Sequence, residues 1–558
     1  MLIIVLLVFP VIISNGQTLA NQDFKDTFND LRATDASSSK RLYNGIVLPE
    51  VWPPNDVDPL SDESDNIPYL RYPAEGGYKP DIIDITIGRQ LFVDDFLIAN
   101  TDLTTVYHKP VQYDGNPVLK PETYYELSAT QPGAGPKSGG VWYDMDEGIY
   151  KMWYEAGWNH RLAYATSTDG INWDKSNVPN GKGSNIVLWD KQTDSTTVWI
   201  DYDTTDPSQK YKMLVRSPNP DTTATLYVSG NGIDWTAVKE TSNVDDRTTF
   251  FYNWFRKQWV FSIRRNANIN YHGLLLRQRV RYYRESPDFI EGGVWNDKEA
   301  VFWLKTDAKD PINVTHRQVP QLYNFDAIAY ESIMVGMFQI WQGPHNDVAS
   351  ATKTPKTTEL IAAYSRDGFY FHRPDRSVFI EATEEKGDWN RGYVQSVGGG
   401  IIIQKDELWI YHIGFSGSYN GRTGMHTGFS TGFSILRRDG FASLNGTGKV
   451  TTNTLTTKGD KKYLFVNAKV PDGSIAAQIL DASGKVVEGY SFDDCKTFTG
   501  DQTQIMITWK NASDLSFLNN SQFKIEFKLV NGEFYSFWLS DDINGNSDGA
   551  TAAGLVQQ

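Results

Sequence analysis

The sequence has a single cysteine, Cys495, among 558 residues. One thiol excludes an intramolecular disulfide framework and any zinc cluster built from cysteines. Basic residues are also in the minority, with 53 Lys and Arg against 68 Asp and Glu and a net charge of −15. This balance argues against a protein whose surface as a whole binds nucleic acid or an anionic membrane.

Several common catalytic fingerprints are missing as well. The sequence contains no H-E-x-x-H, no phosphate-binding loop and no dinucleotide-binding glycine pattern. These absences exclude the usual metalloprotease and nucleotide-binding classes. No motif supports a cofactor or a metal site, and a calcium ion in a central channel would have no motif either, so we expect no cofactor.

Long apolar runs are absent after the first residues of the chain. Residues 1–14 are almost entirely apolar but too short for a comfortable membrane span, and they are followed by small polar residues. This pattern predicts a signal peptide over 1–16, with a short membrane anchor as the alternative because the usual basic start is missing. Four N-x-[ST] tripeptides favour a secreted glycoprotein; they begin at Asn313, Asn445, Asn511 and Asn519.

Aromatic residues and glycine are abundant, with 17 Trp, 29 Tyr, 28 Phe and 46 Gly. Without long Ala/Leu/Glu/Lys stretches, this composition predicts strands and tight turns. Residues 17–84 look irregular and Pro-rich, and they are expected to form a lead-in over the surface. Regular order is expected from Ile85, where ITIGRQLFV alternates like a strand.

An internal repeat sets the predicted architecture. A strand, a Ser/Asp-Gly turn and a further aromatic recur at 164–173, 227–235, 282–295, 362–374 and 435–444. A strand–turn–strand segment precedes each copy, so each unit has four antiparallel strands. Five such units predict a five-bladed β-propeller over 85–445, with a β-sandwich or barrel as the alternative.

The pattern of apolar and polar residues changes after Asn445. Shorter, regularly alternating strands predict a C-terminal β-sandwich over 446–540. Cys495 falls within it and is expected to be a packing residue. The final residues, 541–558, are polar and Gly-rich and are predicted to form a disordered tail.

Eight segments together resemble a known group of proteins: LFVDDFLI (91–98), SGGVWYD (138–144), STTVWID (195–201), DRTTFFYN (246–253), QLYNFDAIAYES (321–332), SRDGFYFHRPDR (365–376), GDWNRGYVQSVGGG (387–400) and LRRDGFASL (436–444). They resemble secreted bacterial proteins related to glycoside hydrolase family 32 and, more broadly, five-bladed propeller hydrolases of families 32, 43, 62, 68 and 117. The resemblance implies two Asp and one Glu at the narrow end of a central funnel. The signatures W-x-N-D-P-N-G, R-D-P and Glu-Cys of the fructosidases are absent, so no catalytic residue is carried over.

Candidate site residues come from aligning the inner strands of the units. The gapless alignment places Lys137, Asp194 and Asp246 at equivalent positions. The remaining units contribute further candidates at or near this level: Asn324, Asp326, Arg391 and Gln395. Carboxylates on neighbouring inner strands are what glycoside hydrolysis requires.

We assign roles to these carboxylates as hypotheses. Asp194 is the expected base or nucleophile, Asp246 the transition-state stabiliser and Asp326 the general acid, with Glu126 and Glu331 as alternative acids. The alternative for any one of them is a strand cap or turn without chemistry. The same alignment places three acidic residues at hairpin turns of the opposite end: Asp144, Asp201 and Glu331.

Positive charge is concentrated in the third unit. Nine basic residues and one acid lie between Asp246 and Arg284, and Arg277, Arg279 and Arg281 alternate along one strand face. The cluster predicts recognition of an anionic, sulfated or uronic-acid sugar, with a solvated surface as the alternative. Other candidate ligand contacts are Arg247, Arg265, His316, His412, Trp158, Trp254 and Trp389.

The combined expectation is a secreted glycoside hydrolase that acts on a plant or algal polysaccharide fragment. Its partner would be a carbohydrate, not a nucleic acid or a membrane. A non-catalytic glycan-binding propeller is one alternative. A polysaccharide lyase that uses a Tyr or His base with Arg is another, because Tyr282 and Tyr283 lie in the Arg cluster.

Overall fold

The computed structural model describes residues 40–62, 67–70, 78–180, 182–218, 221–310 and 312–556. The predicted signal peptide, 1–16, and much of the predicted lead-in lie outside these described residues. The chain separates into two units, residues 1–41 and residues 42–558. Every helix and strand that the structure describes lies in the second unit.

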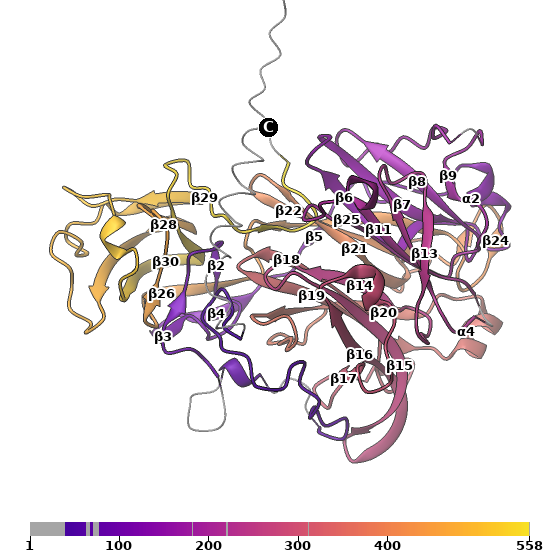
Figure 1. Ribbon diagram of the computed structural model, residues 1–558, viewed down its shortest axis with the longest axis horizontal. Helices are drawn as coiled ribbons and strands as arrows, with labels where there is room; N and C mark the ends of the chain where they lie inside the picture. Colours follow the sequence, from indigo (N-terminus) through magenta and orange to yellow (C-terminus); the bar gives the residue numbers. More distant parts are fainter. Residues whose placement is uncertain are drawn as a thin grey trace, which may run out of the picture. The chain divides into compact units, whose positions relative to one another are not determined.

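The second unit contains a five-bladed β-propeller, as the repeats predict (Figure 1). Each blade is an antiparallel sheet whose first strand in the sequence lies innermost. Blade 1 comprises β6 (Ala134–Asp144), β7 (Ile149–Ala156), β8 (Arg161–Ser167) and β9 (Ile186–Leu188). Blade 2 comprises β10 (Ser195–Ile200), β11 (Tyr211–Arg216), β12 (Thr225–Ser229) and β13 (Thr236–Glu240). Blade 3 comprises β14 (Thr249–Asn253), β15 (Gln258–Tyr271), β16 (Leu274–Ser286) and β17 (Val301–Leu304).

The ring is closed by a strand from before the first blade. Blade 4 comprises β18 (Gln321–Glu331), β19 (Ile333–Gly343) and β20 (Thr357–Ser365). Blade 5 comprises β21 (Gly392–Gln404), β22 (Glu407–Phe415) and β25 (Phe429–Arg437), and its outermost strand is β5 (Val111–Gln112). Because β5 precedes blade 1 in the sequence, its pairing with β25 joins the two ends of the propeller.

The repeated turn has the same hydrogen bond in three blades. A serine hydroxyl at the end of the third strand accepts the backbone N–H of a glycine three residues later, at 2.9 Å in each case; the pairs are Ser167–Gly170, Ser229–Gly232 and Ser365–Gly368. Each glycine has a φ between 72° and 82°, a left-handed backbone that favours glycine. Trp153 of blade 1 donates its indole N–H to the Gly232 carbonyl of blade 2 at 2.7 Å. The repeat therefore both turns the chain and links neighbouring blades.

A second apolar core lies in a sheet system formed mainly by the C-terminal strands. Its strands are β26 (Ala442–Thr452), β27 (Leu455–Thr456), β28 (Tyr463–Asp481), β29 (Phe498–Ile507) and β30 (Phe523–Ser540). Four strands from before the propeller join it: β1 (Ile83–Asp84), β2 (Gln90–Leu91), β3 (Ile98–Thr101) and β4 (Thr104–Tyr107). The ordered segment that begins near Ile85 thus pairs with these strands, whereas the repeat pattern assigned it to the propeller. Cys495 is buried in this core.

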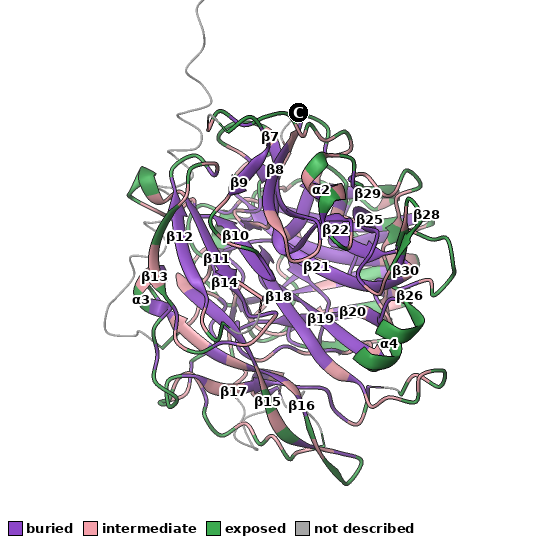
Figure 2. Ribbon diagram, turned by 90° about the vertical axis from the view of Figure 1, so that its right-hand side faces the viewer, coloured by how far each residue is buried: buried purple, intermediate pink, exposed green. Residues whose placement is uncertain are grey.

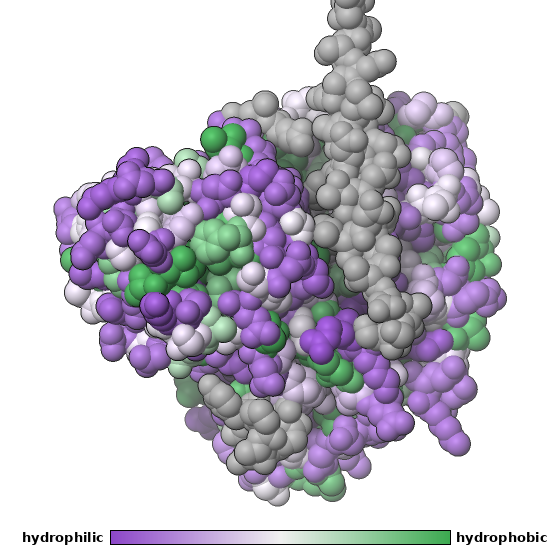
Figure 3. All heavy atoms as spheres, turned by 60° about the vertical axis from the view of Figure 1, so that its left-hand side comes forward, coloured by the Kyte–Doolittle hydropathy of each residue, from purple (hydrophilic) through white to green (hydrophobic). Residues whose placement is uncertain are grey.

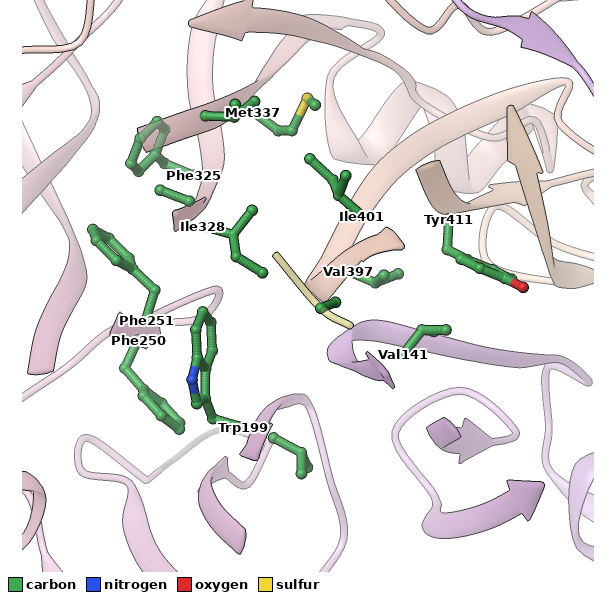
Figure 4. Close-up of a cluster of buried hydrophobic side chains, with 14 of the residues drawn as sticks. Val141, Trp199, Phe250, Phe251, Phe325, Ile328, Met337, Val397, Ile401 and Tyr411 are labelled. Atoms are coloured by element: carbon green, nitrogen blue, oxygen red, sulfur yellow. The ribbon is translucent and has the colours of Figure 1, made fainter. Parts of the chain in front are cut away.

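The segment predicted as a disordered tail is ordered up to residue 556. Its strand β31 (Ala550–Thr551) pairs with β18, and Ala553 accepts the N–H of Tyr143 at 2.9 Å and donates to Ile401 at 2.8 Å. In Figure 4 this segment, in the yellow of the C-terminal residues, runs between Ile328 and Val397. Its small residues suggested disorder, but they are what the narrow channel end accommodates. A Cβ on Gly554 would lie 2.4 Å from the Tyr143 carbonyl oxygen.

Helices are few and short in the described part of the chain. They are α2 (Tyr124–Ser128), α3 (Phe289–Gly292), α4 (Asn346–Thr352) and the 3₁₀ turns η1 (Pro68–Leu70), η3 (Pro207–Gln209) and η4 (Ser516–Leu518). Two further short strands, β23 (Ser418–Tyr419) and β24 (Arg422–Thr423), pair with each other. None of the described helices is long and apolar enough to cross a membrane. Buried residues follow the blade strands in Figure 2, and hydrophilic side chains predominate on the face drawn in Figure 3.

Candidate functional site

Five side chains, one from each blade, meet where the inner strands begin, an end we call the channel mouth. Lys137 Nζ lies 3.9 Å from Asp194 Oδ1, and Arg247 Nη2 lies 3.5 Å from the same oxygen. Arg247 Nε donates to Tyr393 Oη at 3.2 Å, and Tyr393 Oη lies 3.3 Å from Tyr323 Oη. These contacts link blades 1, 2, 3, 5 and 4. We call the five residues the mouth ring.

The backbone of the mouth ring is unusual. Lys137, Arg247 and Tyr393 have φ values of 35°, 61° and 52°, in the left-handed region that side-chain-bearing residues rarely adopt. Such conformations cost on the order of 1–3 kcal/mol each and cluster at functional sites. Three of them in one ring therefore support a functional role for the channel mouth.

Asp194 is the carboxylate with the most cationic neighbours at the mouth. Besides Lys137 and Arg247, Arg216 Nη1 contacts Asp194 Oδ2 at 3.2 Å. About 12% of the Asp194 side chain remains exposed. The predicted Asp194 site is thus an ion-paired carboxylate that a ligand can reach.

Lys137 forms its shortest ion pair with a residue that the inner-strand alignment missed. Glu155 Oε2 lies 2.8 Å from Lys137 Nζ, and neither side chain has exposed surface. Burial raises the pKa of Glu155 to about 7 and lowers the pKa of Lys137 to about 8. Glu155 lies on β7, the second strand of blade 1, so an alignment of first strands could not find it. The available signal was a lone acid within the apolar run MWYEAGW.

Aromatic rings cover the other side of Lys137. Its ammonium lies 3.5 Å from the centre of the Trp158 ring, a cation–π contact. His426 stacks on Trp158 with ring centres 3.6 Å apart. Burial, together with Lys356 and Lys137, holds the pKa of His426 well below its usual range. The sequence predicted Trp158 as a rim aromatic but not His426.

Asp246 is the more exposed of the two predicted mouth acids. Arg264 Nη1 lies 3.2 Å from Asp246 Oδ1 and also contacts Asp245, and about a third of the Asp246 side chain is exposed. Burial and the nearby Arg279 lower the pKa of Arg264 to about 10. Asp246 directly precedes the ring residue Arg247, so the two predicted acids flank one arginine.

A second polar layer lies beneath the mouth ring. Asp326 Oδ2 accepts hydrogen bonds from Ser396 Oγ at 2.6 Å and Asn324 Nδ2 at 2.8 Å, and Ser138 Oγ lies 3.3 Å away. Gln395 Nε2 donates to Ser138 Oγ at 2.8 Å. Burial raises the pKa of Asp326. A cavity of about 20 Å³, room for about one water, adjoins Asp326 on the side away from the mouth.

The predicted position of Asn324 differs from the structure by one residue. A bulge between Leu322 and Asn324 places Tyr323 in the mouth ring, and Asn324 bonds with Ser138 in the layer below. Lys356 Nζ donates to Tyr323 Oη at 3.2 Å. Burial alone would raise the pKa of Tyr323, but Lys356 and Arg247 outweigh it and lower that pKa. The gapless alignment could not foresee a bulge, so it missed Tyr323 and Tyr393.

The two alternative acids lie elsewhere and have other partners. Glu126 caps helix α2 by accepting the N–H groups of Glu122 and Thr123, at 2.6 and 2.7 Å, and also binds Tyr154. Glu331 ends β18, ten residues from its start at the mouth, and pairs with Arg438 at 3.0 Å. Both carboxylates serve local structure. The hairpin-end positions predicted for Asp144, Asp201 and Glu331 agree with the structure, where each pairs with Lys or Arg.

The remaining predicted contacts do not gather at one point. His316 bonds with Thr357 at 3.0 Å, and Arg265 pairs with Asp297 at 3.4 Å. His412 is fully buried near Trp389, and burial lowers its pKa to about 4. Trp254 packs edge-on against Phe255, and Arg391 lies near Gly417. Of the predicted ligand contacts, the structure brings Lys137, Arg247 and Trp158 to the mouth, and Asn324 and Gln395 to the layer beneath it.

Within the described residues, no three His, Cys, Asp or Glu side chains are arranged to hold a metal ion. No protein-family profile matches the chain, and no curated protein shows significant similarity to it.

Distant similarity to solved structures exists. One such structure comes from the GH130 family of mannoside phosphorylases, which contains glycoside hydrolases that target β-1,2-mannosidic linkages in Candida mannan. It is 13% identical to this chain over 62% of this chain and 96% of its own length, with a TM-score of 0.37. A thermostable family-43 glycoside hydrolase is 12% identical over 56% and 93%, with a TM-score of 0.37. The Bombyx mori GH32 β-fructofuranosidase is 9% identical over 81% and 95%, with a TM-score of 0.34.

Proposed function

We propose that the chain is a hydrolase that cleaves a glycosidic bond of an anionic glycan at the channel mouth. The supporting observation is a pair of carboxyl groups on either side of Lys137, Glu155 at 2.8 Å and Asp194 at 3.9 Å. Their nearest oxygens are therefore at most about 7 Å apart, below the ~9.5 Å that is the upper limit for the two carboxyl groups of glycosidases.

The two groups have different electrostatic surroundings. Asp194, with three cations within 4 Å, is the carboxylate that stabilises positive charge at the anomeric carbon or acts as base. Glu155, with a pKa of about 7, retains a proton in part of the population at neutral pH. It is the general acid in this proposal, which separates the two roles as glycosidases require. Asp326, one layer below, is the competing acid. The reaction consumes water and needs no cofactor.

The charge of the mouth supports an anionic substrate. Seven cationic side chains lie in or next to it, against five carboxyl groups. The cations are Lys137, Arg216, Arg247, Arg264, Arg279, Arg281 and Lys356, and the acids are Glu155, Asp194, Asp245, Asp246 and, in the layer beneath, Asp326. Sulfate or carboxylate groups on a sugar fit guanidinium donors better than neutral hydroxyls do.

The experiment is a screen of sulfated, uronic-acid and neutral polysaccharides for release of reducing ends. Asp194→Asn and Glu155→Gln are expected to lower the rate by about 10²–10⁴-fold, the contribution typical of acid–base groups. Asp326→Asn tests the competing acid. Asp201→Asn is the matched control, because Asp201 is also buried and ion-paired, with Lys212 at the opposite end. Full activity in both Asp194→Asn and Glu155→Gln would refute the assignment.

A lyase is the second candidate, favoured by the lowered pKa of Tyr323. Its phenolate would take the proton next to a uronate carboxylate, the glycosidic oxygen would leave, and a carbon–carbon double bond would form. Lys356 and Arg247 would hold the uronate. An ultraviolet-absorbing product that Tyr323→Phe abolishes and Asp194→Asn does not would establish this reaction. Binding without any product would instead indicate a glycan-binding propeller.

Secretion is part of the proposal and is supported by the apolar residues 1–14. Amino-terminal sequencing of protein collected from the culture medium tests it. A start near residue 17 is expected, and retention of Met1 in protein extracted only with membranes would favour the anchor.

A further inference from the structure

Strands β15 and β16 form a hairpin that continues past its neighbours. Pairing runs from Trp259↔Ser286 to Tyr271↔Leu274, whereas β14 pairs with β15 only up to Ser262 and β17 pairs with β16 only from Arg281. Residues 264–281 therefore extend beyond the blade as a two-stranded arm. The arm is visible at the lower edge of Figures 1 and 2, where its free end is exposed.

One face of the arm carries only arginine and asparagine over three successive rungs. Directly opposed residues of an antiparallel pair point to the same side. The rungs are Arg264↔Arg281, Asn266↔Arg279 and Asn268↔Arg277. No acidic residue occurs in 264–281. We call these six residues the Arg–Asn face.

The inner rung of this face belongs to the channel mouth. Arg281 donates to the carbonyl of Arg247 at 2.5 Å and to Asn324 Oδ1 at 3.3 Å, and Arg264 pairs with Asp246. Arg279 reaches Gln321 at 2.6 Å at the start of β18. The face therefore continues directly from the mouth ring.

Exposure increases outward along the face. Arg281 is fully buried, whereas Asn266, Asn268 and Arg277 are exposed. From Arg281 to Arg277 the strand covers about 13 Å, at ~3.3 Å per residue. Arg277 and Arg279 form no ion pair with any residue that the structure describes. Arg279 is held by Gln321 and by the rings of Tyr323 and Trp341, so Arg277 is the arginine whose guanidinium group is available to an anionic partner.

The opposite face holds the arm in place. Ile269, Tyr271 and Val280 are buried, and Tyr271 Oη donates to the carbonyl of Asp310 at 2.8 Å. Asp310 is in turn paired with Arg373 at 2.8 Å, with both side chains fully buried. The Arg–Asn face is thus presented on a fixed support, which reduces the entropy lost on binding.

We propose that the Arg–Asn face is an outer binding track for a polyanionic glycan chain that leads into the channel mouth. Guanidinium groups bind sulfate or carboxylate through paired donors, and Asn amides bind sugar hydroxyls. Asparagine is otherwise disfavoured in strands, so strand formation does not account for its alternation at 266, 268 and 270, whereas its side-chain amide does fit this role. The track extends the proposed function, since it presumes that the chain reacts at the mouth, but binding to it is measurable separately.

The test is calorimetric titration of the full chain with sulfated and uronate oligosaccharides of increasing length, and with neutral oligosaccharides as a reference. Affinity should increase with length until mouth and track are filled. Arg277→Ala is expected to weaken binding of the long anionic oligosaccharides about tenfold, as loss of one charge-assisted contact does, and to leave disaccharide binding unchanged. Asn268→Ala should act in the same direction and cannot disturb the strand through its propensity.

Arg265→Ala is the matched control. Arg265 lies on the same arm and has the same charge, but it points to the opposite face and pairs with Asp297. Equal loss in Arg265→Ala and Arg277→Ala, or no loss in Arg277→Ala, would overturn the track. Single-stranded DNA that binds as tightly as the glycans, with the same dependence on Arg277, would overturn its glycan character.

The track and the hydrolase can fail independently. If no glycan is cleaved but length-dependent binding disappears in Arg277→Ala, the track stands and the hydrolase proposal falls. If long anionic glycans are cleaved with the same KM by wild type and Arg277→Ala, the hydrolase stands and the track falls.

Discussion

The ammonium of Lys137 lies 2.8 Å from the Glu155 carboxyl group, and neither side chain touches solvent. A buried pair of this kind is expensive to break from one side, because the remaining charge loses its partner. Glu155 also has a carboxyl oxygen without a hydrogen-bond partner, so part of the cost of burying its charge is not offset.

The first prediction concerns the energetics of this pair. Lys137→Met is expected to lower the free energy of unfolding by about 3–5 kcal/mol, because Glu155 is left buried without its cation. Lys137→Met combined with Glu155→Gln should be less destabilising than the sum of the single changes. Urea denaturation of the four proteins in a double-mutant cycle measures the coupling. Additive effects would show that the pair contributes no coupling energy.

The second prediction concerns stability against pH. Between pH 4.5 and 7 the folded chain holds a proton at Glu155 that the unfolded chain has released, so the free energy of unfolding falls as the pH rises through this window. The Glu155 contribution is on the order of 3 kcal/mol. Glu155→Gln should remove this dependence, because glutamine resembles the protonated acid and does not titrate, so the stability of wild type relative to the variant should fall as the pH rises from 4.5 to 7. Comparing the two proteins cancels the opposite contribution of buried His412 and His426. Parallel curves would contradict the raised pKa.

The third prediction separates acid catalysis from charge binding. With Glu155 as general acid, kcat/KM should decline above about pH 7, tenfold per pH unit. Glu155→Gln should lose this limb and most activity on polysaccharide. It should keep activity on aryl glycosides with good leaving groups, because these need no proton from the enzyme. If Asp326→Asn gives that pattern instead, the acid is Asp326.

The fourth prediction concerns the segment that closes the channel. Gly554 has a φ of 129° and no room for a Cβ, whereas Gly484 has a φ of 89° with open space around it. Gly484→Ala is expected to cost about 1 kcal/mol from backbone conformation alone. Gly554→Ala should cost ~2 kcal/mol more, because the Tyr143 carbonyl must move. Thermal unfolding of both variants compares them, and equal shifts in Tm would refute the tight packing.

The fold was largely predictable because a repeat reports architecture directly. Each unit carries its own turn, with Ser167, Ser229 and Ser365 in the same role, so five copies predict five blades. The order of the C-terminal segment was not predictable from composition. Glycines such as Gly549 and Gly554 are typical of disordered sequence, and only the neighbouring strands show that small residues are required at these positions.

The site was predictable in part. Asp194 and Lys137 come together because equivalent positions of neighbouring inner strands are neighbours in space. The alignment of inner strands missed Glu155 because this residue reaches the mouth from the second strand of its blade. The same alignment missed Tyr323 because a bulge shifts the register of β18 by one residue, and a gapless alignment cannot include a bulge.

The C-terminal segment, residues 550–556, also affects the order in which the propeller folds. Its Ala553 bonds with Tyr143 of the first blade and Ile401 of the fifth, so residues from nearly the whole described chain meet at one place. During synthesis, blades 1 to 5 are complete in sequence before residues 550–556 exist. The channel end therefore lacks its last strand until these residues have been synthesised. Contacts of such long sequence separation form slowly.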